Sequence, residues 1–256
     1  MVANEIDLVP IHRQSLLIAT LVGLAWLLTL VIAISRDIHQ WTVAWILTFI
    51  ILRSFLHTGL FILAHDAMHY SLAPLNKELN NQIGKICLFL YAGLSFESCS
   101  QKHSLHHQFP ESPLDPDFHL SVSSMPFNWY FKFLMNYLGY KQLFILVSAW
   151  FFMLQIINSC SIKNIIFFCI LPLIISSFQL FTVGTWLPHK QTGTNSKKRF
   201  PSSLSLHPII SFAACYHFGY HLEHHLSPNT PWFKLPDLHR TSLKSELASV
   251  SVDRAL

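Results

Sequence analysis

Residues 58–69 read Thr-Gly-Leu-Phe-Ile-Leu-Ala-His-Asp-Ala-Met-His, an apolar stretch that runs directly into a pair of histidines. It forms the end of a long apolar segment, residues 41–64, and ~20 mostly apolar residues are enough for a helix to cross a bilayer. Residues four apart lie on the same face of a helix, so His65 and His69 can point at one metal ion. This part of the sequence therefore predicts a membrane helix that ends in metal ligands.

The composition indicates a membrane protein. Hydrophobic residues make up 52% of the 256 residues, the mean hydropathy is +0.40, and only 12% of the residues are charged. That charged share is about half of what soluble domains carry. The net charge of +4 is too small and too scattered for nucleic-acid binding. Five cysteines without a CxxC pair favour neither a disulfide framework nor a zinc site. We expect one membrane domain over residues 1–256.

Four segments are apolar and long enough, or nearly so, to cross a membrane: residues 15–34, 41–64, 142–157 and 165–183. The third is short, and Pro172 interrupts the fourth. Residues 83–95 are too short to span and are expected to lie along the interface or to re-enter the membrane. The first segment exceeds the ~7–15 apolar residues of a signal peptide, so we expect it to be retained. The predicted fold is all-α, with about four transmembrane helices and a helical cap that carries the histidine motifs.

Two further histidine motifs share one spacing. Residues 103–107 read His-Ser-Leu-His-His, and residues 221–225 read His-Leu-Glu-His-His. Positions i, i+3 and i+4 form one patch on a helix, so the three rings of each motif can converge. His217 lies four residues before the third motif and would extend its stripe by one turn, and His189 follows the fourth apolar segment. One such motif is often a surface or core feature, but three in one small membrane protein favour metal binding.

The number of histidines indicates how many ions they bind. The three motifs supply eight imidazoles and His189 a ninth. Nine is too many for one ion, whereas two ions with four or five nitrogens each fit. Imidazole alone does not choose among zinc, copper, iron and nickel. The scarcity of carboxylates argues against the glutamate-rich di-iron centre of soluble helix bundles.

Four carboxylates lie in or near the motifs. Asp66 and Glu223 are rotated by ~100° and ~200° from the leading histidine of their motif. This places them behind the ligands, where a carboxylate orients a histidine through its other N–H; the alternative for Glu223 is a solvated surface residue. Asp115 and Asp117 flank a proline after the second motif. They either form a turn, for which Asp and Pro are suited, or fix one of the last two histidines of that motif.

Two ionisable residues, Arg53 and His57, lie inside the second apolar segment. Such residues usually face the interior of the helix bundle and have a function, although the long side chain of Arg53 can also reach the membrane surface. His57 lies ~80° around the helix from His65. We therefore do not expect His57 to be a metal ligand.

The histidine motifs resemble those of the membrane fatty-acid-desaturase superfamily, and narrower strings resemble the β-carotene ketolases within it. The strings are Thr58-Gly-Leu-Phe-Ile-Leu-Ala-His-Asp-Ala-Met-His69, His106-His107 followed by Leu114-Asp-Pro-Asp-Phe118, Leu187-Pro-His-Lys190, Cys215-Tyr-His-Phe-Gly-Tyr-His-Leu-Glu-His-His225 and Pro231-Trp-Phe-Lys-Leu-Pro236. They cover nearly all of the chain after the first apolar segment. Tyr70 departs from the pattern, because glycine is expected after the first motif.

The resemblance implies two iron ions, dioxygen as co-substrate and a set of metal-binding residues. The implied ligands are His65, His69, His103, His106, His107, His189, His221, His224 and His225. Five further residues are candidates for an additional ligand or for orienting a ligand: His217, Asp66, Asp115, Asp117 and Glu223.

The resemblance also implies an activity, the oxidation of the ring methylene at C4 of β-carotene to a ketone by two successive hydroxylations. The substrate is dissolved in the membrane lipid. Electrons must come from an external donor, because the sequence has no GxGxxG nucleotide fingerprint and no CxxC-type iron–sulfur spacing; the family implies a ferredoxin-type donor. The alternatives on the same scaffold are a carotenoid hydroxylase and a fatty-acyl desaturase. A metal transporter is disfavoured, because only the second apolar segment carries Arg and His.

The distribution of basic residues predicts that both termini and the histidine cap are cytoplasmic. Fourteen lysines and arginines fall in the two tails and in the loop 65–141, whereas the other two loops contain only Arg36 and Lys163. Basic loops face the cytoplasm. Reporter fusions at the C-terminus should therefore read as cytoplasmic, and fusions after Arg36 as external. A C-terminal fusion that reads as external would refute this arrangement.

Overall fold

The computed structural model describes residues 5–118, 126–190 and 201–243. Within these ranges all regular secondary structure is helical, which confirms the predicted all-α class. The first half contains α1 (Glu5–Ile34), α2 (Val43–Met68), α3 (Lys77–Ala92), α4 (Phe96–Gln108), α5 (Pro126–Tyr137) and α6 (Tyr140–Ile156). The second contains α7 (Ile162–Ile165), α8 (Leu171–Leu180), α9 (Leu187–His189), α10 (Pro208–Cys215) and α11 (His221–Leu226). Short elements are the 3₁₀ helices η1 (Ile38–Gln40) and η4 (Trp232–Lys234) and the π-helices η2 (Ile166–Ile170) and η3 (Phe181–Trp186).

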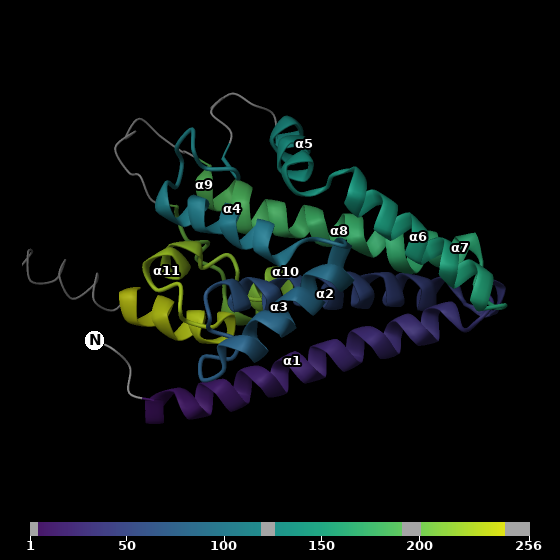
Figure 1. Cartoon of the computed structure of the whole chain (residues 1–256), viewed down its shortest axis with the longest axis horizontal. Helices are drawn as coiled ribbons and strands as arrows, with labels where there is room; N and C mark the ends of the chain where they lie inside the picture. Colours follow the sequence, from purple (N-terminus) through teal and green to yellow (C-terminus); the bar gives the residue numbers. More distant parts are fainter. Residues whose placement is uncertain (1–4, 119–125, 191–200, 244–256) are drawn as a thin grey trace, which may run out of the picture.

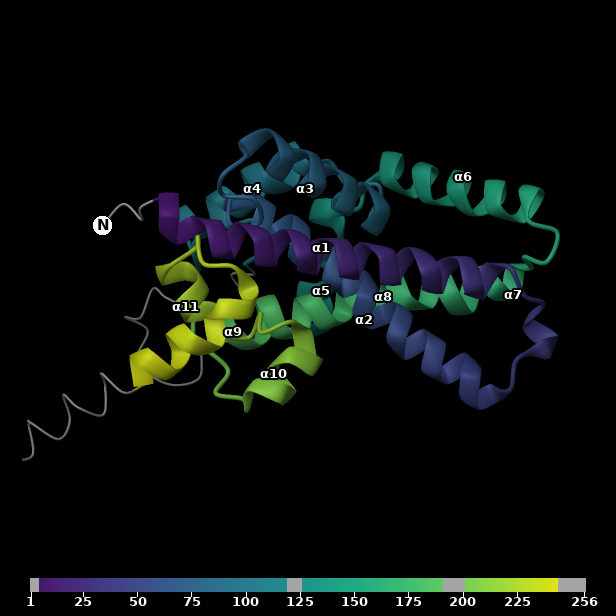
Figure 2. The same ribbon diagram turned by 90° about the horizontal axis from the view of Figure 1, so that it is seen from below.

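Three long helical segments run side by side and form the body of the molecule (Figures 1 and 2). They are long and apolar enough to cross a membrane: Leu8–Ile34, Val43–Met68 and Ile162–His189. The second of them, α2, contacts α1, α3 and α8 and so lies at the centre. The histidine-bearing elements α4, α9 and α11 gather at one end (Figure 1). A bent pair, α5 with α6, supplies a fourth candidate span, so the expectation of about four spans is confirmed.

The third predicted span differs from the expectation. α6 has 17 residues, fewer than the ~20 that a span needs. It meets α5 at a bend of 81°, so residues 142–157 qualify as a span only together with α5. No residue of α6 is fully buried: one side packs against the core through residues such as Leu146 and Trp150, and exposed residues such as Phe144 are free to face lipid. α3, which contains most of the short segment 83–95, packs along α2.

Arg53 is buried inside the bundle and compensates for Pro172. Proline has no N–H, so it leaves the carbonyl four residues earlier without its helical partner. That carbonyl belongs to Phe168, and Arg53 Nε donates to it at 2.8 Å. Arg53 Nη1 also donates to the carbonyl of Trp26 at 2.9 Å. Arg53 therefore joins α2 to α1 and η2, and the helical segment continues through Pro172 instead of breaking there.

His57 also has a structural role. Its Nδ1 accepts a hydrogen bond from the Trp26 indole at 3.1 Å, and its Nε2 donates to the carbonyl of Tyr91 at 2.8 Å. Both ring nitrogens are thus occupied by partners on α1 and α3. Among the residues that the structure describes, His57 also belongs to none of the groups of side chains that could hold a metal ion.

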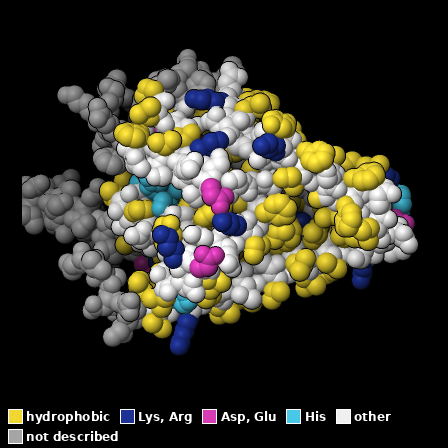
Figure 3. Space-filling model, viewed as in Figure 1, with side chains coloured by type: hydrophobic (Ala, Val, Ile, Leu, Met, Phe, Trp, Pro, Cys, Tyr) yellow, Lys and Arg dark blue, Asp and Glu magenta, His cyan; other side chains and the backbone are white. Residues whose placement is uncertain are grey.

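The face of the molecule in Figure 3 is divided in the way a membrane protein requires. On its tapered half, short of the tip, the coloured side chains are mostly hydrophobic. Charged side chains gather on the broad half, where α4, α9 and α11 lie, and a few more lie at the tapered tip. An apolar belt between two charged ends matches a bilayer with water on both sides.

Gly84 allows α3 to approach its neighbours closely. A Cβ atom there would lie 2.3 Å from Phe96 Cε2 and 2.9 Å from Ala67 Cβ. We expect Gly84→Ala to destabilise the protein by ~1–3 kcal/mol through overpacking and to lower the unfolding midpoint in detergent. Gly23→Ala in α1 is the matched control, because nothing lies within 4 Å of its Cβ position. Equal midpoints for both variants would contradict the close packing of α3.

Candidate metal centre

Four parts of the chain bring the nine predicted ligands together. His65 occupies the last turn of α2, and His69 is the C-cap residue of that helix. The second motif lies on α4, whose start is fixed by the Ser95 side chain accepting from Ser98 N. His189 ends α9, and the third motif opens α11. Each motif is helical, as its spacing predicts, and the nine rings fall into two groups.

Cluster 1 consists of five histidines: His65, His69, His103, His107 and His224. One nitrogen from each ring lies within 4.8 Å of the corresponding nitrogen of every other ring. The shortest Nε2–Nε2 distances are 2.7 Å between His69 and His103 and 2.9 Å between His107 and His224. All three motifs therefore contribute to this cluster.

Cluster 2 consists of four histidines: His106, His189, His221 and His225. The Nε2 atom of His221 lies 3.0 Å from that of His189 and 3.2 Å from that of His225, which in turn lies 3.1 Å from His106 Nε2. The two clusters adjoin, because the rings of His107 and His225 stack at 4.2 Å between centroids. The second and third motifs each divide their histidines between the clusters.

Burial keeps most of these rings uncharged. It lowers the pKa of His103, His221 and His224 well below the usual value, and the charge of neighbouring histidines acts in the same direction. A neutral imidazole keeps a lone pair on one nitrogen, which is the form that binds a metal ion. Within each cluster, the nitrogen lone pairs therefore face one another at distances of no more than 4.8 Å.

This donor set fits two metal ions. Several Nε2 atoms face two others, yet a single proton between two rings can satisfy only one such contact. The Nε2 atom of His65 is buried and has no hydrogen-bond partner in the described parts of the chain. One cation in each cluster would satisfy these lone pairs with five and four imidazoles, which matches the four to five nitrogens per ion that the sequence predicts.

Asp115 both forms a turn and orients a histidine. Burial opposes protonation of His106, but the Asp115 carboxylate, 3.0 Å from its Nδ1, together with the charges of Asp117 and Glu111, outweighs burial and raises the pKa of His106. The proton is thereby held on Nδ1, and Nε2 turns toward cluster 2. Asp115 also accepts backbone N–H groups of Asp117 at 2.8 Å and Glu111 at 3.0 Å. The two alternatives for Asp115 are therefore compatible.

Sequence reasoning missed Glu111. Its Oε1 lies 3.4 Å from Nδ1 of His189, behind cluster 2. Glu111 has a positive φ of 57° and sits in the turn that Asp115 organises. Its only signal in the sequence is its nearness to the second motif, because the contact depends on how α9 packs against this turn.

Asp117 has a carboxylate oxygen within 4.8 Å of a ring nitrogen of His106, whereas Asp66 and Glu223 belong to none of the groups of potential metal ligands in the described parts of the chain. Asp66 accepts the backbone N–H of Trp232 at 3.1 Å, and its other oxygen is 3.9 Å from His65 Nδ1. Glu223 is buried, so the solvated alternative is wrong; it accepts from His239 Nδ1 at 2.7 Å and from the Ser203 hydroxyl. These two residues hold η4 and the segment before α10 against the metal-binding helices.

His217 belongs to neither cluster. The expected extension of the third stripe is wrong, because Tyr216 and His217 both have positive φ and α10 ends before them. His217 instead stacks on Tyr220, with centroids 5.8 Å apart. Tyr70 also has a positive φ of 57° and is 48% exposed. It therefore faces outward, in a backbone conformation that explains why glycine suits this position.

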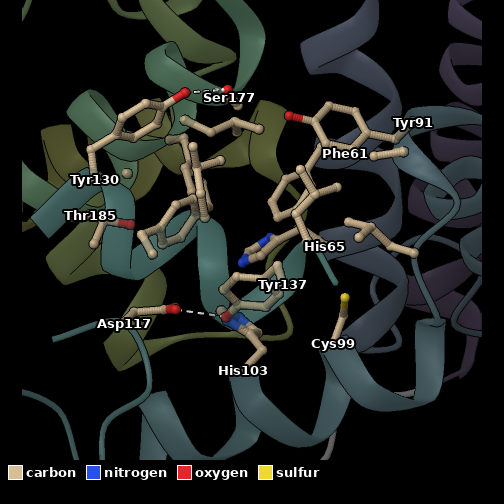
Figure 4. Close-up of a pocket in the computed structure, with 18 of the residues that line it drawn as sticks. Phe61, His65, Tyr91, Cys99, His103, Asp117, Tyr130, Tyr137, Ser177 and Thr185 are labelled. Carbon is tan, nitrogen blue, oxygen red and sulfur yellow. Dashed lines mark hydrogen bonds between the residues drawn. The ribbon is translucent and has the colours of Figure 1, made fainter. Parts of the chain in front are cut away.

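A largely apolar cavity of about 1090 Å³, its open mouth included, adjoins both clusters. Figure 4 shows His65 and His103 at one end and Tyr130 and Ser177 at the other. His106 and His221 of cluster 2 also line it, as does Asp117, whose Oδ1 accepts the Tyr137 hydroxyl at 2.6 Å. Small-molecule sites have this size and this mixture of apolar walls with few polar groups.

The family model "Fatty acid desaturase" matches residues 39–160 and 140–252, so the chain belongs to the desaturase-like membrane proteins. Within them it belongs with the carotenoid ketolases. It is 36% identical over 193 residues to a Paracoccus sp. (strain PC1) protein named "Beta-carotene ketolase", covering 73% of this chain and 76% of the relative.

Two algal relatives are longer than this chain. "Beta-carotene 4-ketolase 3" of Haematococcus lacustris is 37% identical over 201 residues, which are 76% of this chain and 62% of the relative. "Zeaxanthin 4-ketolase" of Chlamydomonas reinhardtii is 35% identical over 199 residues, which are 76% of this chain and 44% of the relative.

The two clusters predict two metal ions per chain, and the kinship with the desaturase-like proteins predicts that both are iron. Metal analysis of the purified protein should give a value close to two, and His224→Ala should lower it by removing one ligand of cluster 1. His217→Ala is the matched control, since His217 is a buried histidine of the same region outside both clusters. One zinc per chain with full activity, or equal metal loss in both variants, would contradict this assignment.

Proposed function

We propose that this protein is a β-carotene 4-ketolase that uses two iron ions and dioxygen. The observation that carries the proposal is the cavity, whose inner end is lined by histidines of both clusters. The kinship with ketolases supports the substrate class. The ring methylene at C4 would be oxidised to a ketone.

The cavity suits a substrate that arrives through lipid. Ile174 lines it, is 52% exposed and lies within the candidate span Ile162–His189. The mouth is thus on the membrane-facing part of the molecule. A carotenoid ring can enter there and pass Phe61, Phe133 and Phe218. It then lies near His65 and His103, while the apolar remainder of the carotenoid stays in the bilayer.

The chain's own residues position the ring and exclude water. The iron ions, when bound, supply the activation of dioxygen. Displacement by about 1 Å can cost on the order of a hundredfold in rate, so the aromatic walls that hold the ring decide which carbon reacts. C4 is allylic to the ring double bond, which weakens its C–H bonds.

The overall reaction sets the need for a reductant. Each hydroxylation consumes one dioxygen, two electrons and two protons, and releases one water. A carbon with two hydroxyl groups then loses water to give the ketone. Because the sequence carries no nucleotide or iron–sulfur motif, the electrons come in this proposal from a ferredoxin-type donor at the charged, cytoplasmic end of the molecule.

Expression in a host that accumulates β-carotene tests the proposal directly. We expect 4-keto products by chromatography with mass detection, and a 4-hydroxy intermediate that accumulates first when oxygen or reductant is limiting. His65→Ala should abolish the product, because it removes a cavity-facing histidine of cluster 1.

Products hydroxylated only at C3 would identify a carotenoid hydroxylase. Unchanged pigments together with altered fatty-acid unsaturation would identify a desaturase. Either result would refute the ketolase proposal while leaving the family assignment intact.

A further inference from the structure

Among the described residues, Thr185, like Ser15 and Thr182, lacks the side-chain hydrogen bond that most hydroxyl groups in the long helices form. Five of these donate to the carbonyl four residues earlier at 2.7–3.1 Å, the usual arrangement in helices: Thr20, Thr29, Thr48, Ser54 and Thr58. Thr185 forms no side-chain hydrogen bond to any residue that the structure describes. It lies in the π-helix η3, whose wider turn redirects the carbonyl groups. Its hydroxyl is therefore left available.

This available hydroxyl points into the cavity beside the metal clusters. Thr185 is only 7% exposed and lines the cavity, and Figure 4 shows it on the same side as Asp117. The neighbouring Gly184 brings η3 very close to Phe218, because a Cβ there would lie 2.3 Å from the ring. Phe218 in turn contacts His65, with ring centroids 4.7 Å apart. Thr185 thus lies on the cavity wall between Tyr130 and Asp117 (Figure 4).

Asp117 adds an acceptor to the same wall. One carboxylate oxygen accepts the Tyr137 hydroxyl at 2.6 Å. The second oxygen has no hydrogen-bond partner among the described residues. Asp117 is 9% exposed, and a buried polar group without a partner is costly. Thr185 and Asp117 therefore offer a donor and an acceptor to a ligand in an otherwise apolar cavity.

We propose that Thr185 and Asp117 form a subsite that binds a hydroxyl group on the ring of the substrate. The inference rests on the proposed ketolase function. Thr185 donates to the hydroxyl oxygen, and Asp117 accepts its proton in a hydrogen bond. The hydroxyl can be the one that the first oxidation leaves on C4, or one already present on the adjacent carbon C3.

The consequence for the reaction is retention of the alcohol. An apolar cavity alone would bind the alcohol less well than the hydrocarbon, because the hydroxyl would lose its hydrogen bonds to water or lipid headgroups. With the subsite, the alcohol stays in place with the same carbon near the metal clusters. The second oxidation then occurs before release, and the product is the ketone.

Thr185→Val tests the subsite, because it removes the hydroxyl and keeps the shape. The assay uses the full-length, iron-loaded protein in membranes with an electron donor, and three substrates: β-carotene, 4-hydroxy-β-carotene and zeaxanthin. We expect the apparent KM for a hydroxylated substrate to rise about fivefold, the loss of one neutral hydrogen bond. With β-carotene, the ratio of released alcohol to ketone should rise by a similar factor.

Two control variants separate this effect from general damage. Thr185→Ser keeps a hydroxyl and should restore the wild-type product ratio. Thr182→Val makes the same change in the same π-helix, but the Thr182 hydroxyl is buried and does not line the cavity. It should leave the product ratio unchanged. The iron content of all variants should equal that of the wild type.

The substrates distinguish the two sources of the hydroxyl. A raised KM for 4-hydroxy-β-carotene supports retention of the intermediate, and a raised KM for zeaxanthin alone supports recognition of a C3 hydroxyl. Unchanged KM values and product ratios in Thr185→Val would overturn the subsite. If the wild-type protein forms no ketone from any substrate, the proposed function itself fails, which is a different result.

Discussion

Nine imidazoles that face one another, most of them buried, are the constraint on which the structure depends. Neutral rings at these distances bring nitrogen lone pairs close together, and there are too few ring protons to give each lone pair a hydrogen bond. Protonating more of the rings is disfavoured, because burial lowers the pKa of histidines such as His103 and His224. The packing of the long helices brings α2, α4, α9 and α11 together at these rings, and two cations would satisfy the lone pairs. Gly84 brings α3 and α4 close to α2, and Gly184 brings η3 close to Phe218.

The polar groups inside the membrane-spanning part fix the helices that deliver these ligands. Arg53 supplies the hydrogen bond that Pro172 cannot, and it joins α2 to α1 and η2. His57 joins the same helix to α1 and α3. In lipid, an unpaired backbone group cannot form a hydrogen bond to water instead. These contacts therefore keep α2 in one position along its neighbours. His65, which lies about three turns beyond Arg53 on α2, is placed by them.

The sequence predicts the features that depend on local periodicity. The three motifs are helical, and their nine histidines gather as the spacing requires. The division into five and four is not predictable, because each HxxHH motif sends its histidines to both clusters. Glu111 and the 81° bend before α6 also depend on contacts between distant segments. His217 shows the limit of periodicity. Tyr216 and His217 have positive φ and lie between α10 and α11, so His217 is not on the helix that carries the third motif.

The two clusters are chemically unequal, and this follows from the carboxylates behind them. In cluster 2, Asp115 is hydrogen-bonded to His106 Nδ1 at 3.0 Å, and Glu111 lies 3.4 Å from His189 Nδ1 without hydrogen-bond geometry. In cluster 1, the described contact of this kind is 3.9 Å, between Asp66 and His65, too long for a hydrogen bond. A carboxylate behind an imidazole makes it a more basic ligand. His106 of cluster 2 is therefore a more basic donor than a histidine without such a partner, cluster 1 has more histidines, and the cavity is lined by histidines of both clusters.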